Sequence, residues 1–298
     1  QSSARRPHST HDTHTQRAPA RATDPVSGPQ SPPMTRGDPS STYEAAILDL
    51  DGTIYLGDRL IPGAAASVAA LRDRGIDVVF LTNKAIDRRQ KYAEKLTGLG
   101  LAARRDDVIN SGWITARYAA DRYPDRQAFV IGEDPLVDEF VAAGLTVDQR
   151  EPGDLLVVSM DREFTYEKLR LALRTLDNGA PFLATNPDRT CPTAHEPIPD
   201  AAGMIGAVEG VSGRTVDRVL GKPSSAVAET ALSELGADPS ECLMIGDRLE
   251  TDIEMGARVG METVLVMSGV TDRGTLSAAD LSPDHVLDSI ADIGAVLE

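Results

Sequence analysis

Two aspartates separated by one residue are the first candidates for chemistry in this sequence. Asp49 and Asp51 come at the end of the apolar run Ala45–Leu50 and before Gly52, which lets the chain turn close to a ligand. In an extended chain, residues i and i+2 face the same side, about 6.6 Å apart, so both carboxylates can address one small group. Two neighbouring acids coexist when a cation lies between them or when one is protonated. The pair predicts a metal-assisted or acid–base site; an acidic turn without a function is the alternative.

Polar residues also follow or precede other predicted elements. Thr82 and Asn83 come directly after the apolar run Ile76–Leu81 and offer donors for a phosphoryl oxygen. Lys222 precedes the predicted helix Ser225–Leu235 and can neutralise a bound anion. An ordinary turn at Thr82 and a solvated surface charge at Lys222 are the alternatives for these two segments.

A second pair of acids lies near the C-terminal end of the chain. Asp247 follows the apolar run Cys242–Ile245, and Asp252 falls in the first turn of a predicted helix, where the helix dipole favours a carboxylate. Mg²⁺ usually takes one or two carboxylates, together with waters and phosphate, so Asp49 and Asp247 suffice for a magnesium site. For Asp252, capping of the helix is the alternative, and both roles can hold.

Apolar runs and amphipathic stretches alternate from Tyr43 onward. This alternation predicts βαβ units and a mainly parallel α/β sheet covered on both faces, with ligands beyond the carboxyl ends of the strands. Predicted strands are Ala45–Leu50, Ile76–Leu81, Ala128–Ile131, Leu155–Ser159, Phe182–Ala184, Cys242–Ile245 and Thr263–Met267. Predicted helices are Gly63–Arg74, Asp87–Leu99, Leu136–Ala143, Thr165–Asn178, Ser225–Leu235 and Thr251–Val259.

Taken together, these segments resemble the phosphatases of the haloacid dehalogenase (HAD) superfamily. The chain is most similar to the branch with the NagD-type, p-nitrophenyl phosphate and phosphoglycolate/pyridoxal phosphatases, over about residues 43–298. The matching motifs are Asp49–Thr53, Thr82-Asn83, Gly221–Pro223, Gly246–Asp252, Met160–Tyr166, Ala184–Asp188 and Gly269–Thr271.

The resemblance implies a doubly wound, Rossmann-like parallel-sheet core over residues 42–117 and 215–298. An inserted α/β cap of the C2 type is expected over residues 118–214, because about 140 residues between Asn83 and Lys222 exceed what a loop needs. Residues 1–41 are almost empty of Val, Ile, Leu and Phe, which predicts a disordered leader. Met34 is an alternative start of the reading frame.

The resemblance also implies a Mg²⁺-dependent phosphatase that hydrolyses small phosphate monoesters through an aspartyl phosphate. Asp49 is expected to attack phosphorus, and Asp51 to protonate the leaving group and then deprotonate the attacking water. The other implied roles are as follows: Thr53 orients Asp51; Asp49, the Asp51 carbonyl, Asp247 and Asp252 hold Mg²⁺; Thr82 and Lys222, with Asn83 nearby, hold the phosphoryl oxygens.

One residue departs from the family pattern. The family usually continues Thr-Asn with a second Asn, whereas this chain has Lys84, which adds a cation able to contact the substrate. In the cap, Asp188 is the candidate for substrate contact, and His195 is expected to be a loop residue. Sugar phosphates, phosphoglycolate, glycerol phosphate, pyridoxal phosphate and nucleoside monophosphates all remain open as substrates.

Three other functions are alternatives to the phosphatase. A phosphotransferase of the same fold would pass the phosphoryl group to an alcohol. A phospho-acceptor receiver domain would be about half as long and would lack both Asp51 and the insertion. A homologue that only binds a phosphorylated ligand would not need the full set of catalytic side chains.

Composition narrows the class of protein further. The chain has 298 residues, 41% of them hydrophobic, with 30 basic and 46 acidic side chains and a formal charge of −16. This balance argues against a nucleic-acid partner, and no apolar run is long enough to cross a membrane. Two distant cysteines favour a reducing, cytoplasmic location. The excess of acidic residues with only five lysines fits a halophilic source, and a GC-rich genome is the alternative. The family resemblance also leads us to expect a homodimer.

Overall fold

The computed structural model describes residues 43–191 and 196–298. The predicted leader and His195 lie outside these described residues. The strands are β1 Ala45–Asp49, β2 Tyr55–Leu56, β3 Arg59–Leu60, β4 Asp77–Thr82, β5 Val108–Asn110, β6 Ala128–Ile131, β7 Leu155–Val158, β8 Phe182–Ala184, β9 Thr190–Cys191, β10 Ile198–Pro199, β11 Arg218–Val219, β12 Cys242–Gly246, β13 Glu262–Val266 and β14 His285–Leu287. The α-helices are α1 Ala64–Asp73, α2 Arg89–Gly98, α3 Ser111–Arg122, α4 Asp134–Ala142, α5 Tyr166–Asp177, α6 Ala201–Ser212, α7 Ser225–Leu235, α8 Glu254–Val259 and α9 Arg273–Ala278.

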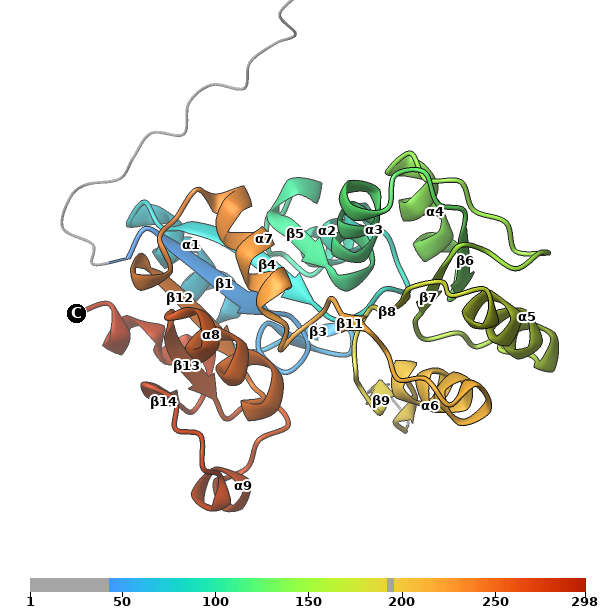
Figure 1. The fold of residues 1–298 in the computed structure, drawn as a ribbon. Helices are drawn as coiled ribbons and strands as arrows, with labels where there is room; N and C mark the ends of the chain where they lie inside the picture. The colour runs from blue at the N-terminus through green and yellow to red at the C-terminus, as the bar shows by residue number, and fades with distance from the viewer. Residues whose placement is uncertain (1–42, 192–195) are drawn as a thin grey trace, which may run out of the picture. The chain divides into compact units, whose positions relative to one another are not determined.

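The larger sheet has six strands in the order β14-β13-β12-β1-β4-β5 (Figure 1). Every neighbouring pair in it is parallel, and β1 lies between β4 and β12. Parallel neighbours end at the same edge of a sheet, so Asp49, Thr82 and Gly246 come together there. The predicted α/β fold with a parallel sheet is confirmed.

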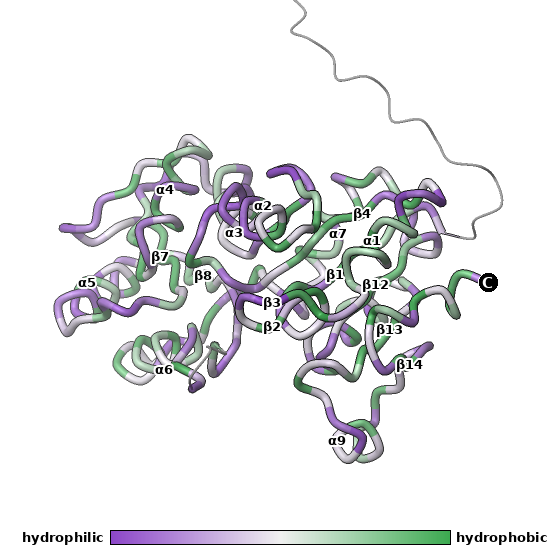
Figure 2. The backbone as a smooth tube through the Cα atoms, turned by 180° about the vertical axis from the view of Figure 1, so that it is seen from behind, coloured by the Kyte–Doolittle hydropathy of each residue, from purple (hydrophilic) through white to green (hydrophobic). Residues whose placement is uncertain are grey.

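Residues of β1 alternate between two apolar clusters, because successive side chains of a strand point to opposite faces. Ala45 and Ile47 pack in one cluster with residues of α3, α7 and α8. Ala46 and Leu48 pack in another with residues of α1 and α2. All four side chains are buried, so the sheet is covered by helices on both faces. Figure 2 shows the resulting pattern: β4 lies in a hydrophobic stretch, whereas α5 carries many hydrophilic residues.

The smaller sheet has four strands in the order β11-β8-β7-β6. One of its faces packs against α5 and α6, and the other joins the cluster that contains α3 and α4. The sheet uses residues between Ala128 and Val219, and β11 therefore lies beyond the expected end of the cap at residue 214. Strand β11 has only two residues, which is too short for a hydrophobic pattern to reveal it. The division into core and cap stays a prediction, and we extend its second boundary to Val219.

The segment after β12 differs from the prediction. The expected helix from Thr251 begins earlier, as a π-helical turn over Leu249–Ile253 that runs into α8. In this turn, Asp252 Oδ2 accepts a hydrogen bond from the Arg248 backbone N–H at 3.0 Å. Asp252 thus caps the turn and still has its other carboxylate oxygen for another partner.

Two further features concern the lengths of the helices and the two cysteines. Among residues 43–191 and 196–298, no helix combines the length and the hydrophobicity needed to span a membrane. Cys191 and Cys242 are both buried.

Candidate active site

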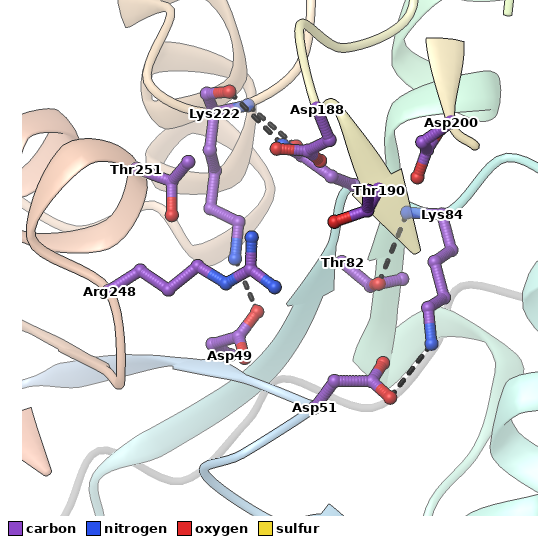
Figure 3. A pocket seen from close by; sticks show the side chains of 11 residues that line it. Asp49, Asp51, Thr82, Lys84, Asp188, Thr190, Asp200, Lys222, Arg248 and Thr251 are labelled. Carbon is purple, nitrogen blue, oxygen red and sulfur yellow. Dashed lines mark hydrogen bonds and ion pairs between the residues drawn. The ribbon is translucent and has the colours of Figure 1, made fainter. Parts of the chain in front are cut away.

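A polar pocket lies at the carboxyl ends of β1 and β4, and residues of both sheet regions line it (Figure 3). From the larger-sheet region come Asp49, Asp51, Thr82, Asn83, Lys84, Lys222, Arg248 and Thr251. From the region of the smaller sheet come Asp188, Thr190 and Asp200. The pocket therefore gathers most of the residues that the strand-end pattern singled out.

Lys222 is the central cation of this pocket. Its side chain is only 3% exposed, and its ammonium contacts Asp49 Oδ1 and, at 2.7 Å, Asp252 Oδ1. Burial alone lowers the pKa of this lysine, but the ion pairs with Asp252 and Asp49 outweigh that effect and leave the pKa raised. Lys222 is therefore positively charged across the whole working range of pH.

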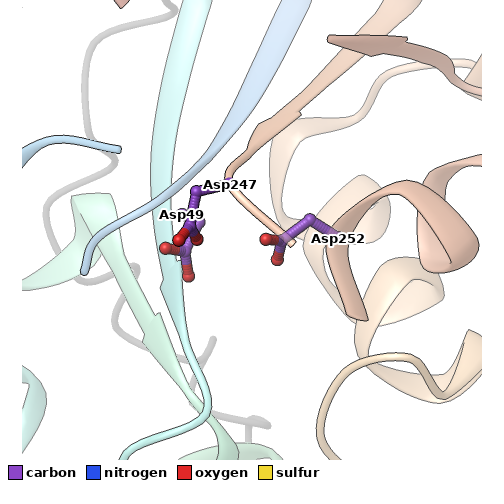
Figure 4. A group of neighbouring side chains, drawn as sticks. All are labelled: Asp49, Asp247 and Asp252. Carbon is purple, nitrogen blue, oxygen red and sulfur yellow. The ribbon is translucent and has the colours of Figure 1, made fainter. Parts of the chain in front are cut away.

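Three buried carboxylates form a cluster around this position (Figure 4). One oxygen each of Asp49, Asp247 and Asp252 lies within 4.8 Å of the others. Asp247 Oδ2 accepts a hydrogen bond from the Val270 backbone N–H at 2.6 Å, but its Oδ1 is buried and has no hydrogen-bond partner in the described part of the chain. A buried carboxylate oxygen without a partner is costly, so this oxygen is suited to a cation.

The pKa values of the cluster show the same excess of negative charge. Burial, and then the charges of Asp252 and Asp247, raise the pKa of Asp49 well above its ordinary value against the opposing effect of Lys222. Burial and the charge of Asp252 raise the pKa of Asp247 to about 7. A hard divalent cation with a preference for oxygen ligands fits this set of donors, and Mg²⁺ is such an ion.

Two glycines leave room for Asp247. A Cβ atom on Gly52 would lie 2.4 Å from Asp247 Oδ2, and one on Gly269 would lie 1.9 Å from it. Gly52 also has a φ of +92°, which side-chain-bearing residues rarely adopt. Both glycines belong to motifs that the sequence analysis singled out, and their lack of a side chain lets the backbone approach this carboxylate.

Asp51 points into the same pocket as Asp49 but has different partners. The Lys84 ammonium lies 2.8 Å from Asp51 Oδ1, and burial and then the nearby Asp51 charge raise the pKa of Tyr55. Thr53, which was expected to orient Asp51, makes no hydrogen bond through its buried hydroxyl among the described residues. That role of Thr53 stays a prediction without support from these contacts.

Asn83 links the two sheet regions. Its Oδ1 accepts a hydrogen bond from the Lys222 N–H at 2.8 Å, and its Nδ2 donates to the Lys222 carbonyl at 3.1 Å and to Asp188 Oδ2 at 3.0 Å. Asn186 donates to the same Asp188 oxygen and to the Asn83 carbonyl. The amide of Asn83 is thus engaged by protein groups, and its contacts hold Lys222 and Asp188 beside the pocket.

Four residues that line the pocket were not singled out from the sequence. Arg248 and Thr251 lie inside the motif Gly246–Asp252 but carry no spacing signal of their own. Thr190 and Asp200 lie at the edges of short elements of the smaller-sheet region, and only the fold brings them to the site.

Comparisons with known proteins agree with this architecture. The sequence profile of the haloacid dehalogenase-like hydrolases matches residues 46–146, and a second profile of HAD-like hydrolases matches residues 219–293. The sugar-phosphatase AraL of Bacillus subtilis is 37% identical over 266 residues, which cover 89% of this chain and 97% of that protein.

Solved structures show the same similarity. A 4-nitrophenylphosphatase from Thermotoga maritima superimposes with a TM-score of 0.83 at 34% identity, covering 87% of this chain and 99% of its own. NagD from Escherichia coli K-12 has a TM-score of 0.78 at 31% identity, covering 84% of this chain and 98% of its own. The chain therefore belongs to the haloacid dehalogenase-like hydrolases, in their NagD-like phosphatase branch.

Proposed function

We propose that this protein is a Mg²⁺-dependent phosphatase that hydrolyses small phosphate monoesters through an aspartyl phosphate on Asp49. The observation that carries the proposal is the buried carboxylate cluster of Asp49, Asp247 and Asp252 around the Lys222 ammonium. Relatives named as a sugar phosphatase and a 4-nitrophenylphosphatase support the reaction class and the small substrate.

In the first step, a carboxylate oxygen of Asp49 attacks phosphorus, and the bond from phosphorus to the leaving oxygen breaks. Asp51 gives its proton to that oxygen, so the leaving group departs as a neutral alcohol. Lys222 and Thr82 contact the phosphoryl oxygens and offset their charge. This offset matters because an anionic nucleophile approaches an anionic phosphate in a protein of charge −16.

In the second step, Asp51 takes a proton from a water molecule, and the water oxygen attacks phosphorus. The bond between phosphorus and Asp49 breaks, which releases inorganic phosphate and restores the carboxylate. Asp49, Asp247 and Asp252 would hold Mg²⁺, as would the Asp51 carbonyl. When bound, the ion supplies positive charge that stabilises the phosphoryl group and the ionised carboxylates.

We also propose that the inserted segment acts as a cap over this site. Asp188, Thr190 and Asp200 line the pocket from the region of the smaller sheet, across from Asp51 (Figure 3). In this proposal, they contact the leaving group of the substrate, and the segment excludes water during the first step.

The test measures release of inorganic phosphate from p-nitrophenyl phosphate and from glycerol phosphate, without any added alcohol acceptor. We expect turnover with Mg²⁺, none after chelation, and recovery when Mg²⁺ is restored. Asp49→Asn should abolish turnover while the circular dichroism spectrum is unchanged. The matched control is Asp58→Asn, because the Asp58 side chain is 97% exposed and outside the pocket, and it should keep full activity.

Three results would contradict the proposal. Full activity of Asp49→Asn would exclude Asp49 as the nucleophile, and turnover without any divalent metal would exclude the requirement for Mg²⁺. Phosphate release that requires an added alcohol would identify a phosphotransferase instead.

A further inference from the structure

Lys84 forms an ion pair in the pocket that the family pattern does not predict. Its ammonium lies 2.8 Å from Asp51 Oδ1, and the two side chains are only 19% and 21% exposed (Figure 3). Attraction between partly buried charges is stronger than at an open surface, where such pairs contribute little. This pair is therefore well placed to fix the orientation of the Asp51 carboxyl group.

The backbone of Lys84 is held on both sides. Its N–H donates to Thr82 Oγ1 at 3.2 Å, and its carbonyl accepts a hydrogen bond from the Tyr92 hydroxyl at 3.1 Å. Tyr92 lies on α2 and is 6% exposed, so this anchor belongs to the core of the protein. These two hydrogen bonds hold the backbone from which the lysine side chain reaches Asp51.

Asp51 has a cationic partner in the Lys84 ammonium. The buried Tyr55 lies near the same carboxylate, because burial and then the Asp51 charge raise the pKa of Tyr55. Burial lowers the pKa of Lys84, but the charge of Asp51 and its hydrogen bond, together with other nearby negative charges, outweigh burial and leave the pKa raised. Lys84 is thus a stable cation that donates to Asp51 and does not exchange protons with it.

We infer that Lys84 is a positioning residue for Asp51. It holds the carboxyl group where it meets the leaving oxygen in the first step and the attacking water in the second. The inference rests on the proposed function, because it assigns proton transfer to Asp51. The proton moves from Asp51 to the leaving oxygen and later from water to Asp51, while Lys84 keeps all of its own protons.

This role predicts a dependence on the leaving group. An alkoxide is a poor leaving group and needs the proton from Asp51, whereas p-nitrophenolate leaves readily without one. A misplaced Asp51 should therefore slow the first step for glycerol phosphate much more than for p-nitrophenyl phosphate.

The experiment compares Lys84→Met with the wild type, using single-turnover rates for both substrates with Mg²⁺ present. For glycerol phosphate, we expect the rate of the first step to fall about 30- to 100-fold. This loss is no larger than the roughly 100-fold rate enhancement at the low end of general acid catalysis, because a misplaced Asp51 still transfers some protons. For p-nitrophenyl phosphate, the rate should fall less than about threefold, and KM for both should change less than about twofold. Lys84→Arg, which keeps the positive charge, should recover part of the loss.

The matched control is Lys91→Met. Lys91 is also a lysine with a carboxylate partner, Asp87 at 2.5 Å, but its side chain is 70% exposed and does not contact Asp51. It should leave both rates unchanged. Thermal unfolding of every variant shows whether the fold is intact, and Lys84→Gln provides a second variant if Lys84→Met does not fold.

Two results would overturn the inference. Equal losses for the two substrates would mean that Lys84 does not act through proton transfer. A raised KM with unchanged single-turnover rate would mean that it binds the substrate instead. Asp51→Asn separates this inference from the proposed function: Lys84→Met should add no further loss to it, whereas a fully active Asp51→Asn would remove Asp51 from the reaction altogether.

Discussion

Replacing Asp247 by asparagine should stabilise the metal-free protein, although it removes a residue of the active site. In the folded protein, the Asp247 pKa is raised from 3.8 to about 7, chiefly by burial. An acid whose pKa is raised on folding lowers stability above its unfolded pKa. This loss begins near pH 4, grows as pH rises, and is complete above pH 7. Asparagine does not ionise and avoids the loss.

The size of the effect follows from the shift. About three pKa units at 1.36 kcal/mol each give an upper bound of about 4 kcal/mol at pH 8, and about 1.6 kcal/mol at pH 5. Half of the upper bound would raise Tm by about 4–8 °C in a chain of this size. The asparagine also fits locally, because its carbonyl oxygen can accept from the Val270 N–H, and its amide can donate to the neighbouring carboxylates.

The assay is thermal unfolding of wild type, Asp247→Asn and Asp58→Asn at pH 5 and pH 8, with chelator and then with Mg²⁺. Without metal, the Tm of Asp247→Asn should exceed that of the wild type by more at pH 8 than at pH 5. Addition of Mg²⁺ should raise the Tm of the wild type by more at pH 8 than at pH 5, and most of this increase should be absent in Asp247→Asn. The reasoning is refuted if Asp247→Asn lowers Tm equally at both pH values, or if it responds to Mg²⁺ as the wild type does.

Two further variants test the same cluster. Lys222→Met should lower the free energy of unfolding by about 3–5 kcal/mol, because it leaves the buried Asp49 and Asp252 carboxylates without their cation; a urea titration showing less than about 1 kcal/mol would contradict this. Gly269→Ala should weaken Mg²⁺ binding at least about tenfold, because its Cβ would lie 1.9 Å from Asp247 Oδ2. Thermal shifts across a series of Mg²⁺ concentrations measure the affinity, which should be unchanged in the control Gly274→Ala. Unchanged affinity in Gly269→Ala would show that Asp247 can move aside.

The sequence predicted the central strands well and predicted helices at α1, α2, α4, α5, α7 and α8, but it missed α3, α6 and α9. Strand β6 lies where it was predicted, and β1, β4 and β12 differ from the prediction by only one residue at their ends. These strands were predictable because each contains at least four consecutive buried residues. Helix α6 has a buried apolar stripe of Ala201, Ile205 and Val208, but Gly203, Gly206 and Gly210 have low helix propensity and masked it. Strand β5 has only three residues and passes directly into α3, so no pattern of its own marks it.

The candidate site was predictable only in part. Asp49, Thr82 and Asp247 come at or just after strand ends, and parallel strands bring their carboxyl ends to one edge, so the sequence alone could group them. The Lys84–Asp51 ion pair and the position of Arg248 could not be foreseen, because they depend on loop conformation. Asp200 reaches the pocket only through the packing of the smaller sheet region.

Two hydrogen bonds between the Asn83 side-chain amide and the Lys222 backbone join residues that are 139 positions apart. These bonds close the intervening chain into a ring, and they fix both ends of the ring at the reaction centre independently of the sequence between them. The entropy of closing such a ring rises only slowly with its length, by about 0.6 kcal/mol for each doubling. The interior of the ring can therefore be lengthened, trimmed or exchanged for that of a relative at little cost to the assembled centre, so that selectivity and chemistry can diverge separately.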